Sequence, residues 1–130
     1  MPQKILLLDS VSPRCADIFE KRGFQADQPP KMELDELKKI IGEYNGVVVR
    51  SATTVDADLL QHAKNLEVIG RAGVGVDNID IDAATARGVL VMNTPDGNTI
   101  STAEHTCAML LALSRNIPEA VNRVKSGGWD

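Results

Sequence analysis

Residues 46–69 read GVVVRSATTVDADLLQHAKNLEVI, and this stretch decides the fold. Residues 46–49, a glycine and three valines, form a short apolar run and predict a strand buried on both faces of a sheet. Residues 56–63 then repeat apolar side chains at helical spacing, and residues 66–69 form a second apolar run. A strand, a helix and a second strand in this order predict two parallel strands joined by a crossover helix.

The same alternation of short apolar runs and helix-period segments extends over the rest of the chain. Apolar runs predict three further strands, at residues 5–8, 24–26 and 89–92. Helical spacing predicts helices at residues 13–22, 33–41 and 81–87, a long helix from about 101, and a final helix from about 118. Five strands, each followed by a helix, indicate an α/β fold: a flavodoxin-like open parallel five-stranded sheet with helices on both faces.

Polar side chains near the helix starts predict how two of these helices begin. Thr53 or Thr54 is a candidate N-cap for the helix that ends near residue 63. Residues 101–104 (STAE) have the serine-to-glutamate spacing of a capping box, which predicts that the long helix starts there. Cys107 falls on the apolar stripe of this helix, so we expect its side chain to be buried in the core.

The composition limits the class of protein. A chain of 130 residues with 43% apolar side chains predicts one compact domain that buries its own core. Fourteen basic and eighteen acidic side chains leave a net charge of −4, which argues against binding to nucleic acid. The first ten residues hold an apolar run of only four, too short for a signal peptide or a membrane span. We therefore expect a cytoplasmic protein with no nucleic-acid or membrane partner.

The cysteines and histidines indicate neither a metal site nor a catalytic pair. Cys15 and Cys107 lie far apart and lack the paired spacing of a zinc site or a disulfide scaffold. His62 and His105 each lack a second histidine or cysteine at ligand spacing. Glu104 and His105 are adjacent on a helix and so do not face each other. We therefore expect no metal ion, and no acid–base pair from Glu104 and His105.

Ligands of an open parallel sheet bind beyond the carboxyl ends of its strands. The residues expected at that edge are 9–10, 50–51, 73–78 and 93–98. An arginine that ends an apolar strand can bind a carboxylate or phosphate with two parallel hydrogen bonds, and Ser51 adds a hydroxyl and a backbone N–H beside it. Spacing alone does not distinguish an Arg50 that binds such a ligand from an Arg50 whose side chain only extends into solvent. Asn98 lies near helix N–H groups that favour an anion, although its position alone favours a helix cap or a turn.

Gly73 and Gly75 follow a predicted strand, as the glycines of a dinucleotide-binding loop do. However, Asn78 stands where the third glycine belongs, and the strand is the fourth rather than the first. Asp96 lies about twenty residues further on, the distance expected of a ribose-binding acid, but it follows a turn after the next strand. An autonomous dinucleotide site is therefore disfavoured. The glycines fit either a tight turn with positive φ or, preferably, a bare backbone that a ligand can approach closely.

Two long segments carry a resemblance to a known family: VVVRSAT at 47–53 and VIGRAGVGVDNIDIDAATARGVLVMNTPDGNTISTAEHT at 68–106. They resemble the D-isomer-specific 2-hydroxyacid dehydrogenases, and the resemblance extends over essentially the whole chain. It implies an NAD-dependent oxidoreductase that transfers hydride between NAD and a small anionic 2-hydroxy acid. It further implies that residues 1–130 are the amino-terminal part of the substrate-binding domain, with the nucleotide-binding Rossmann domain absent from this chain.

The resemblance also implies roles for residues at the sheet edge. Arg50 and Ser51 match a pair that contacts the anionic groups of the substrate, and Asn98 matches an asparagine near the substrate. Residues 73–75 match a loop whose backbone lies against the substrate carboxylate and the nicotinamide end of the cofactor. Val74 replaces a hydroxyl residue that contacts NAD in some relatives, so that side-chain hydrogen bond is lost. The implied substrate-binding residues are Arg50, Ser51, Gly73, Val74, Gly75 and Asn98, and the implied cofactor-binding residues are Val74 and Gly75.

The resemblance also bears on activity and assembly. The family's catalytic arginine, glutamate and histidine belong to a later part of the chain, so this segment alone is expected to be inactive. The parent enzyme is expected to be a homo-oligomer. The long helix from about 101 packs between lobes in this family, so we expect it to leave an apolar face bare and to favour self-association.

Five strand–helix units also occur in proteins of three other functional classes, and the sequence excludes two of these. A receiver domain needs clustered carboxylates, but Asp9 stands alone and the third strand is followed by Arg50. A flavodoxin needs aromatic residues at the flavin ring, yet aromatics make up only 3% of the chain and none directly follows a predicted strand. The alternative that stays open is a stand-alone domain that binds a small anion or another protein without catalysis.

Overall fold

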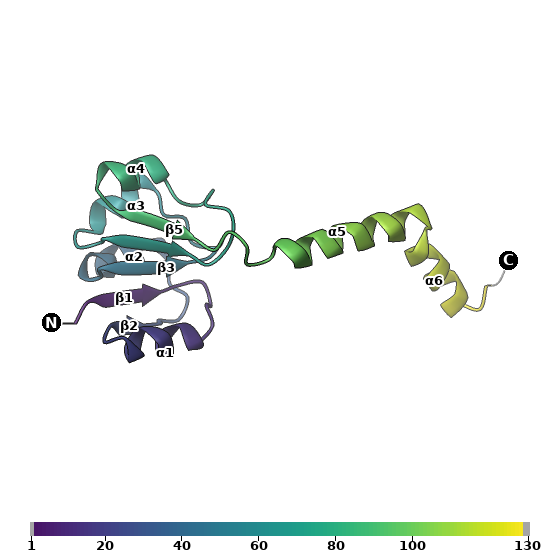
Figure 1. Ribbon diagram of the computed structural model, residues 1–130, viewed down its shortest axis with the longest axis horizontal. Coiled ribbons are helices and arrows are strands. Elements are labelled where there is room, and N and C mark those ends of the chain that lie inside the picture. The colour runs from purple at the N-terminus through teal and green to yellow at the C-terminus, as the bar shows by residue number, and fades with distance from the viewer. Residues whose placement is uncertain (1, 129–130) are drawn as a thin grey trace. The chain divides into compact units, whose positions relative to one another are not determined.

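The computed structural model describes residues 2–128 and divides the chain into two compact units, Met1–Gly97 and Asn98–Asp130. The first unit holds the strands and the hydrophobic core, and the second holds two helices (Figure 1). The composition predicted a single compact domain, but in the described chain every buried apolar side chain lies between Ile5 and Val89. The core is therefore confined to the first unit, because the helices of the second unit expose their apolar side chains.

The first unit is built on one parallel sheet. Within residues 2–128, its five strands follow the order β2-β1-β3-β4-β5 (Figure 1). The strands are β1 (Lys4–Leu7), β2 (Gln25–Asp27), β3 (Gly46–Val49), β4 (Val68–Arg71) and β5 (Leu90–Asn93). The central strand β3 pairs Val47 with Leu6 of β1 on one side and with Ile69 of β4 on the other. This parallel order confirms the predicted flavodoxin-like α/β fold.

Helices cover both faces of this sheet. The helices of the first unit are α1 (Arg14–Lys21), α2 (Leu34–Ile40), the short 3-10 helix η1 (Ile41–Glu43), α3 (Ala57–His62) and α4 (Ile81–Ala86), and those of the second are α5 (Thr99–Ser114) and α6 (Ile117–Lys125). Successive side chains of β1 belong to separate cores, because alternate residues of a strand point to opposite faces. Leu6 packs in a large core with Leu59 and Leu60 of α3, whereas Ile5 and Leu7 pack with Phe19 of α1.

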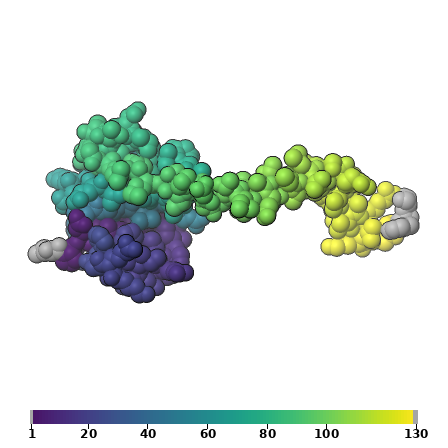
Figure 2. All heavy atoms as spheres, viewed as in Figure 1, coloured from purple at the N-terminus to yellow at the C-terminus, as the bar shows by residue number. Residues whose placement is uncertain are grey.

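The two faces are covered unequally. The core on the α1 side contains few buried residues, while the opposite core spans α2, α3 and α4. On the edge strand β5, Val91 packs against the large core, but its neighbours Leu90 and Met92 are exposed at 59% and 55%. Figure 2 shows the residues of the first unit gathered into one compact body. The α1 side of the sheet is therefore left partly bare at β5.

Aspartates rather than threonines cap α3 and α4. Asp56 Oδ1 accepts a hydrogen bond from the Leu59 N–H at 2.8 Å, and Asp80 makes the equivalent bond at the start of α4 at 2.9 Å. These bonds satisfy N–H groups that the first turn of a helix leaves without an intrahelical partner. The prediction that Thr53 or Thr54 caps α3 is wrong, because Asp56 directly precedes the first helical residue and takes that position.

The start and the environment of α5 also differ from the predictions. The capping box at 101–104 is wrong, because α5 already begins at Thr99. Ser101 lies in its first turn, where its hydroxyl donates to the Asn98 carbonyl at 3.0 Å. Cys107, expected in the core, is exposed. The cause is the same for the whole helix: α5 has no buried residue against which an apolar stripe could pack.

Candidate functional site

The segments that follow β3, β4 and β5 are joined at one edge of the sheet. After β4, the Ala72 N–H donates to the last carbonyl of β3 at 2.8 Å. After β5, the Thr94 N–H donates to the Gly73 carbonyl at 3.0 Å. Because the strands are parallel, these segments all leave the sheet at its carboxyl edge. The first unit therefore brings Arg50 and the glycine loop, residues 73–75, to the edge at which ligands of such sheets bind.

Arg50 is the first residue after β3, and its side chain is exposed. Its backbone is bonded at both ends: the N–H donates to Asp9 Oδ2 at 2.8 Å, and the carbonyl accepts from Asn78 Nδ2 at 2.7 Å. In the described part of the chain, no carboxylate lies within ion-pair distance of the guanidinium. Ser51 follows in a bend and is exposed as well. The backbone here is fixed, while the cationic head is accessible to a ligand.

Asp9 holds the segment that carries Arg50. Besides the Arg50 N–H, its carboxylate accepts the Thr53 N–H at 3.0 Å and the Thr53 hydroxyl at 2.5 Å. Burial raises the pKa of Asp9, but hydrogen bonds from Thr53, Arg50 and Ala52 outweigh burial and leave the pKa below its ordinary value. Asp9 and Ser10 have left-handed φ values of 60° and 52°. A non-glycine residue in that region is uncommon and is found more often where function requires it.

The glycine loop is a bare backbone and not a left-handed turn. Neither Gly73 nor Gly75 has a positive φ, so the tight-turn explanation is wrong. A Cβ added at Gly73 would collide with the guanidinium of Arg71, and a Cβ added at Gly75 would lie 2.8 Å from Asp77 Oδ1. The groups that lie close to this backbone are side chains of the same chain, so the preferred interpretation, close approach of a ligand, stays a prediction.

The carbonyls of the glycine loop are used, whereas two of its N–H groups are not. The Val74 carbonyl accepts from Asn93 Nδ2 at 2.7 Å, as the Gly73 carbonyl does from the Thr94 N–H. Within residues 2–128, no acceptor lies within hydrogen-bond distance of the Val74 or Gly75 N–H. Both residues are exposed. Two neighbouring N–H donors without a protein acceptor are suited to an anionic oxygen.

Two polar atoms near the edge are buried without a partner. Arg71 Nε and Asn78 Oδ1 make no hydrogen bond, although each atom is shielded from solvent. Buried polar atoms are nearly always hydrogen-bonded, so an exception marks a place where something other than stability has shaped the structure. Both atoms belong to residues at the carboxyl edge, next to the glycine loop in the chain.

Asn98 belongs to the second unit, where it occupies the N-cap position of α5. Its carbonyl accepts the Thr102 N–H at 2.9 Å and the Ser101 hydroxyl. Its side chain makes no capping hydrogen bond. Asn98 is therefore at a helix start, as its position favoured, but the amide that could contact a ligand takes no part in the cap.

The histidines have local roles. His62 Nδ1 lies 2.9 Å from the Asp58 carbonyl, one turn earlier in α3, and His105 is exposed on α5. Among residues 2–128, no three His, Cys, Asp or Glu side chains are grouped so as to hold a metal ion. His62 belongs to the first unit, and its ring nitrogen contacts its own helix.

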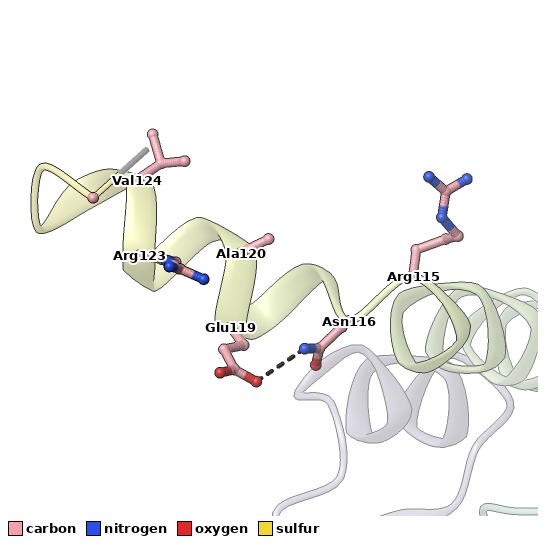
Figure 3. Close-up of a pocket in the computed structure, with 7 residues that line it drawn as sticks. Arg115, Asn116, Glu119, Ala120, Arg123 and Val124 are labelled. Atoms are coloured by element: carbon pink, nitrogen blue, oxygen red, sulfur yellow. Dashed lines mark hydrogen bonds between the residues drawn. The ribbon is translucent and has the colours of Figure 1, made fainter. Parts of the chain in front are cut away.

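A hollow in the second unit lies between the end of α5 and α6 (Figure 3). Its lining consists of Arg115, Asn116, Glu119, Ala120, Arg123, Val124 and Gly128. Asn116 Nδ2 donates to Glu119 Oε2 at 2.9 Å across its floor, so the one carboxylate there already has a partner. The sequence predicted no ligand contact in this region, and the lining side chains are exposed. We assign no role to this hollow.

The role of two residues at the edge was not predicted. The sequence placed Asp9 and Asn78 at this edge, within residues 9–10 and 73–78, because they follow predicted strands. It gave neither residue a role at Arg50, yet both bind the Arg50 backbone. These hydrogen bonds join residues far apart in the chain, so no local pattern points to them.

Comparisons with known proteins give a consistent result. The family model described as "D-isomer specific 2-hydroxyacid dehydrogenase, catalytic domain" matches residues 5–127. The D-3-phosphoglycerate dehydrogenase of Archaeoglobus fulgidus is 50% identical over 127 residues, which are 98% of this chain and 24% of that protein. The chain therefore spans about a quarter of the length of such curated relatives.

Solved structures agree with the sequence relatives. The PH0520 protein from Pyrococcus horikoshii OT3 matches with a TM-score of 0.85 and 28% identity, over 100% of this chain and 39% of that one. The NAD+-bound 3-phosphoglycerate dehydrogenase of Entamoeba histolytica matches with a TM-score of 0.76 and 28% identity, over 86% of this chain and 39% of that one.

Proposed function

Because the chain belongs to the D-isomer specific 2-hydroxyacid dehydrogenase family, we propose that it forms the substrate-binding lobe of an NAD-dependent D-2-hydroxyacid dehydrogenase. The substrate is 3-phosphoglycerate, which the parent enzyme oxidises to 3-phosphohydroxypyruvate in the biosynthesis of L-serine. The 50% identity to a D-3-phosphoglycerate dehydrogenase supports this choice of substrate over other 2-hydroxy acids. A homo-oligomeric, cytoplasmic parent enzyme is part of the proposal.

One observation carries the proposal: an accessible guanidinium and a bare glycine loop share the carboxyl edge of the sheet. Arg50 binds an anionic group of the substrate with two parallel hydrogen bonds, and the Ser51 hydroxyl adds a third. The Val74 and Gly75 N–H groups, which lack protein acceptors, bind the substrate carboxylate. The family resemblance implies a further substrate contact from Asn98.

The residues fit only one end of NAD. Val74 and Gly75 offer an exposed backbone on which the nicotinamide ring can lie, as the family resemblance implies. When bound, NAD accepts the hydride from the carbon that bears the substrate hydroxyl. The fingerprint for the cofactor's phosphates has no match in this sequence, because Asn78 replaces the third glycine. The chain's own contribution is to bind and orient the substrate.

Catalysis requires groups that the described residues do not bring to the edge. The family resemblance assigns the proton transfer from the substrate hydroxyl to a histidine in a later part of the chain, and neither His62 nor His105 matches that histidine. We therefore expect the 130-residue chain to reduce no NAD in the presence of 3-phosphoglycerate. A spectrophotometric assay at 340 nm checks this, and turnover above the enzyme-free rate would contradict it.

The test of the binding site is a titration of 3-phosphoglycerate against the wild type and Arg50→Ala. A bidentate arginine contact contributes about 1.5–3 kcal/mol, so the variant should bind at least about tenfold more weakly. Chemical-shift changes in an NMR titration follow both affinities. Equal affinities would remove Arg50 from the site.

A second function has some support: a stand-alone domain that binds small anions or another protein without catalysis. The first unit has its own core and does not need further chain to bury it, which favours this alternative. The titration distinguishes the two. Binding of inorganic phosphate as tight as that of 3-phosphoglycerate favours the general anion-binding domain, whereas a preference for the hydroxy acid favours the dehydrogenase lobe.

The proposed cytoplasmic location rests on the relatives, which are named as D-3-phosphoglycerate dehydrogenases. None of the helices in residues 2–128 is both long and apolar enough to span a membrane.

A further inference from the structure

We infer that Asp9 and Asn78 are positioning residues. Asp9 accepts a hydrogen bond from the Arg50 N–H and Asn78 donates one to the Arg50 carbonyl, and together these bonds fix where the guanidinium meets the substrate. The inference rests on the proposed function, in which Arg50 binds the substrate. Neither residue is among those implied by the family resemblance. Both act through Arg50 and do not contact the ligand themselves.

Asp9 grips the N–H side of the segment. Its Oδ2 accepts the Arg50 N–H at 2.8 Å and the Thr53 N–H at 3.0 Å, while Oδ1 accepts the Thr53 hydroxyl. Hydrogen bonds to an ionised acceptor are stronger than those between neutral groups. The carboxylate therefore ties the start and the end of the turn at residues 50–53 to the end of β1.

Asn78 grips the carbonyl side of the same segment. Its Nδ2 donates to the Arg50 carbonyl at 2.7 Å and to the Thr53 carbonyl at 2.6 Å. The Asn78 carbonyl in turn accepts the Val55 N–H at 2.8 Å, and Val55 forms an isolated parallel bridge with Ile79. Val55 and Ile79 are buried in the large core. The Asn78 backbone is therefore held by the core, and the two hydrogen bonds of its side chain hold the Arg50 segment in place relative to that core.

Asp9 and Asn78 form hydrogen bonds with the same two residues. Both Arg50 and Thr53 give their N–H to Asp9 and their carbonyl to Asn78, so the segment has no freedom to rotate about its chain direction. The arginine side chain is exposed, so the position of its Cα limits where the guanidinium can reach. Displacement of a binding group by about 1 Å is enough to lose most of its contribution. Loss of the hydrogen bonds made by Asp9, or of those made by Asn78, should therefore weaken substrate binding even though Arg50 is still present.

The experiment is a set of NMR titrations of the 130-residue chain with 3-phosphoglycerate. The variants are Asp9→Asn, which keeps the shape but replaces one acceptor by a donor, and Asn78→Ala. Each should bind at least about fivefold more weakly than the wild type, the factor expected for loss of one hydrogen bond. If Asp9→Asn fails to give a folded spectrum, Asn78→Ala carries the test.

Two controls match these variants without touching the Arg50 segment. Asn65→Ala removes an amide that donates to the Gly42 carbonyl at 2.7 Å, far from Arg50 in the sheet. Asp27→Asn alters a half-buried carboxylate at the carboxyl end of β2 that accepts the Tyr44 hydroxyl. Both controls should keep the wild-type affinity.

A double-mutant cycle separates positioning from general destabilisation. If Asn78 acts through Arg50, then Asn78→Ala should cost nothing further in the Arg50→Ala background, whereas a general loosening would weaken binding in both backgrounds. The Arg50 amide resonance should also move in the Asn78→Ala spectrum. Restoration of most of the lost affinity by Asn78→Gln, which keeps the donor, would support the same assignment.

The failure of the inference differs from the failure of the proposed function. Wild-type affinity in Asn78→Ala and Asp9→Asn, with weaker binding in Arg50→Ala, overturns the inference alone. Additive effects in the cycle overturn it as well. Wild-type affinity in Arg50→Ala overturns the proposed site and the inference together.

Discussion

At the scale of single residues, Asp9 is the group whose ionisation matters to the edge of the sheet. Its carboxylate accepts hydrogen bonds from residues that are 41 and 44 positions away in the chain. These partners donate to the charged form, so the folded chain holds the pKa of Asp9 below its ordinary value despite partial burial. The fold at this edge is therefore linked to the protonation of one side chain.

The pH dependence of stability should report this linkage. An unperturbed aspartate titrates near 3.8, and the folded pKa of Asp9 lies lower. The stabilisation from Asp9 is therefore complete above about pH 3.8 and is lost as the pH falls through the folded pKa. Urea unfolding of the wild type and Asp9→Asn should show a difference at pH 7 that shrinks below pH 3.8. A difference that stays constant with pH would contradict the assignment.

Tyr44 should titrate far above the usual range for tyrosine. Burial raises the pKa of Tyr44 to about 12, helped by its hydrogen bond to Asp27 and by the negative charge of that residue. Tyr44 is the only tyrosine, so absorbance at 295 nm follows it alone. The midpoint should lie near 12 in the folded chain and near the ordinary value of 10 in concentrated urea. The same midpoint in both conditions would mean that the side chain is not buried.

At the scale of helices and strands, the caps make a clear prediction. Asp56 and Asp80 each accept an N–H in the first turn of a short helix, which has few other bonds to hold its start. Asp56→Ala and Asp80→Ala should each lower the free energy of unfolding by about 0.5–2 kcal/mol, as measured in urea. Thr54→Ala serves as the control, since the structure gives Thr54 no capping role, and it should change stability much less.

Element types were predictable from the sequence, but element boundaries were only partly so. Apolar runs located all five strands of the described chain, and β3 has the predicted bounds of 46–49. The fourth strand was expected at 66–69 but spans Val68–Arg71, because pairing with Gly46 sets where it starts. The fifth starts at Leu90 because the Val89 N–H is used by the Ala84 carbonyl. The pairing register of the strands and such long-range hydrogen bonds cannot be predicted from the local spacing of apolar residues.

The candidate site was predictable to a similar degree. The rule that ligands bind beyond the carboxyl ends of strands led to Arg50 and to residues 73–75, which the structure places at one edge. The supports of Arg50 could not be predicted, because Asp9 and Asn78 are separated from it by 41 and 28 residues. The prediction that Cys107 is buried was wrong, because an apolar stripe on a helix is buried only where another surface packs against it.

At the scale of the whole molecule, the two units differ in how they treat apolar side chains. The first unit buries most of its large aliphatic residues, whereas α5 exposes a series of them, including Leu110 at 63% and Leu113 at 70%. Exposed apolar surface of this kind usually marks a place of contact between chains. The structure thus agrees with the expectation of a bare helix face, while the contact itself stays a prediction.

The chain should self-associate through α5. Multi-angle light scattering should give an apparent mass that rises with protein concentration, because association buries the exposed leucines. The variant with Leu110→Gln and Leu113→Gln, which alters two residues one turn apart on α5, should shift the mass toward that of a monomer. A monomer mass at every concentration of the wild type would contradict the prediction.

The unequal division of the core has a consequence for how the first unit fluctuates. On the α1 side, only Ile5, Leu7 and Val11 are buried, and α1 itself has no fully buried residue. Local opening costs least where the fewest apolar contacts are broken. The corner formed by α1 and β2 should therefore detach while β3 and β4 stay paired, and its amide protons should exchange with solvent first. The ligand edge next to β3 would keep its geometry through such openings.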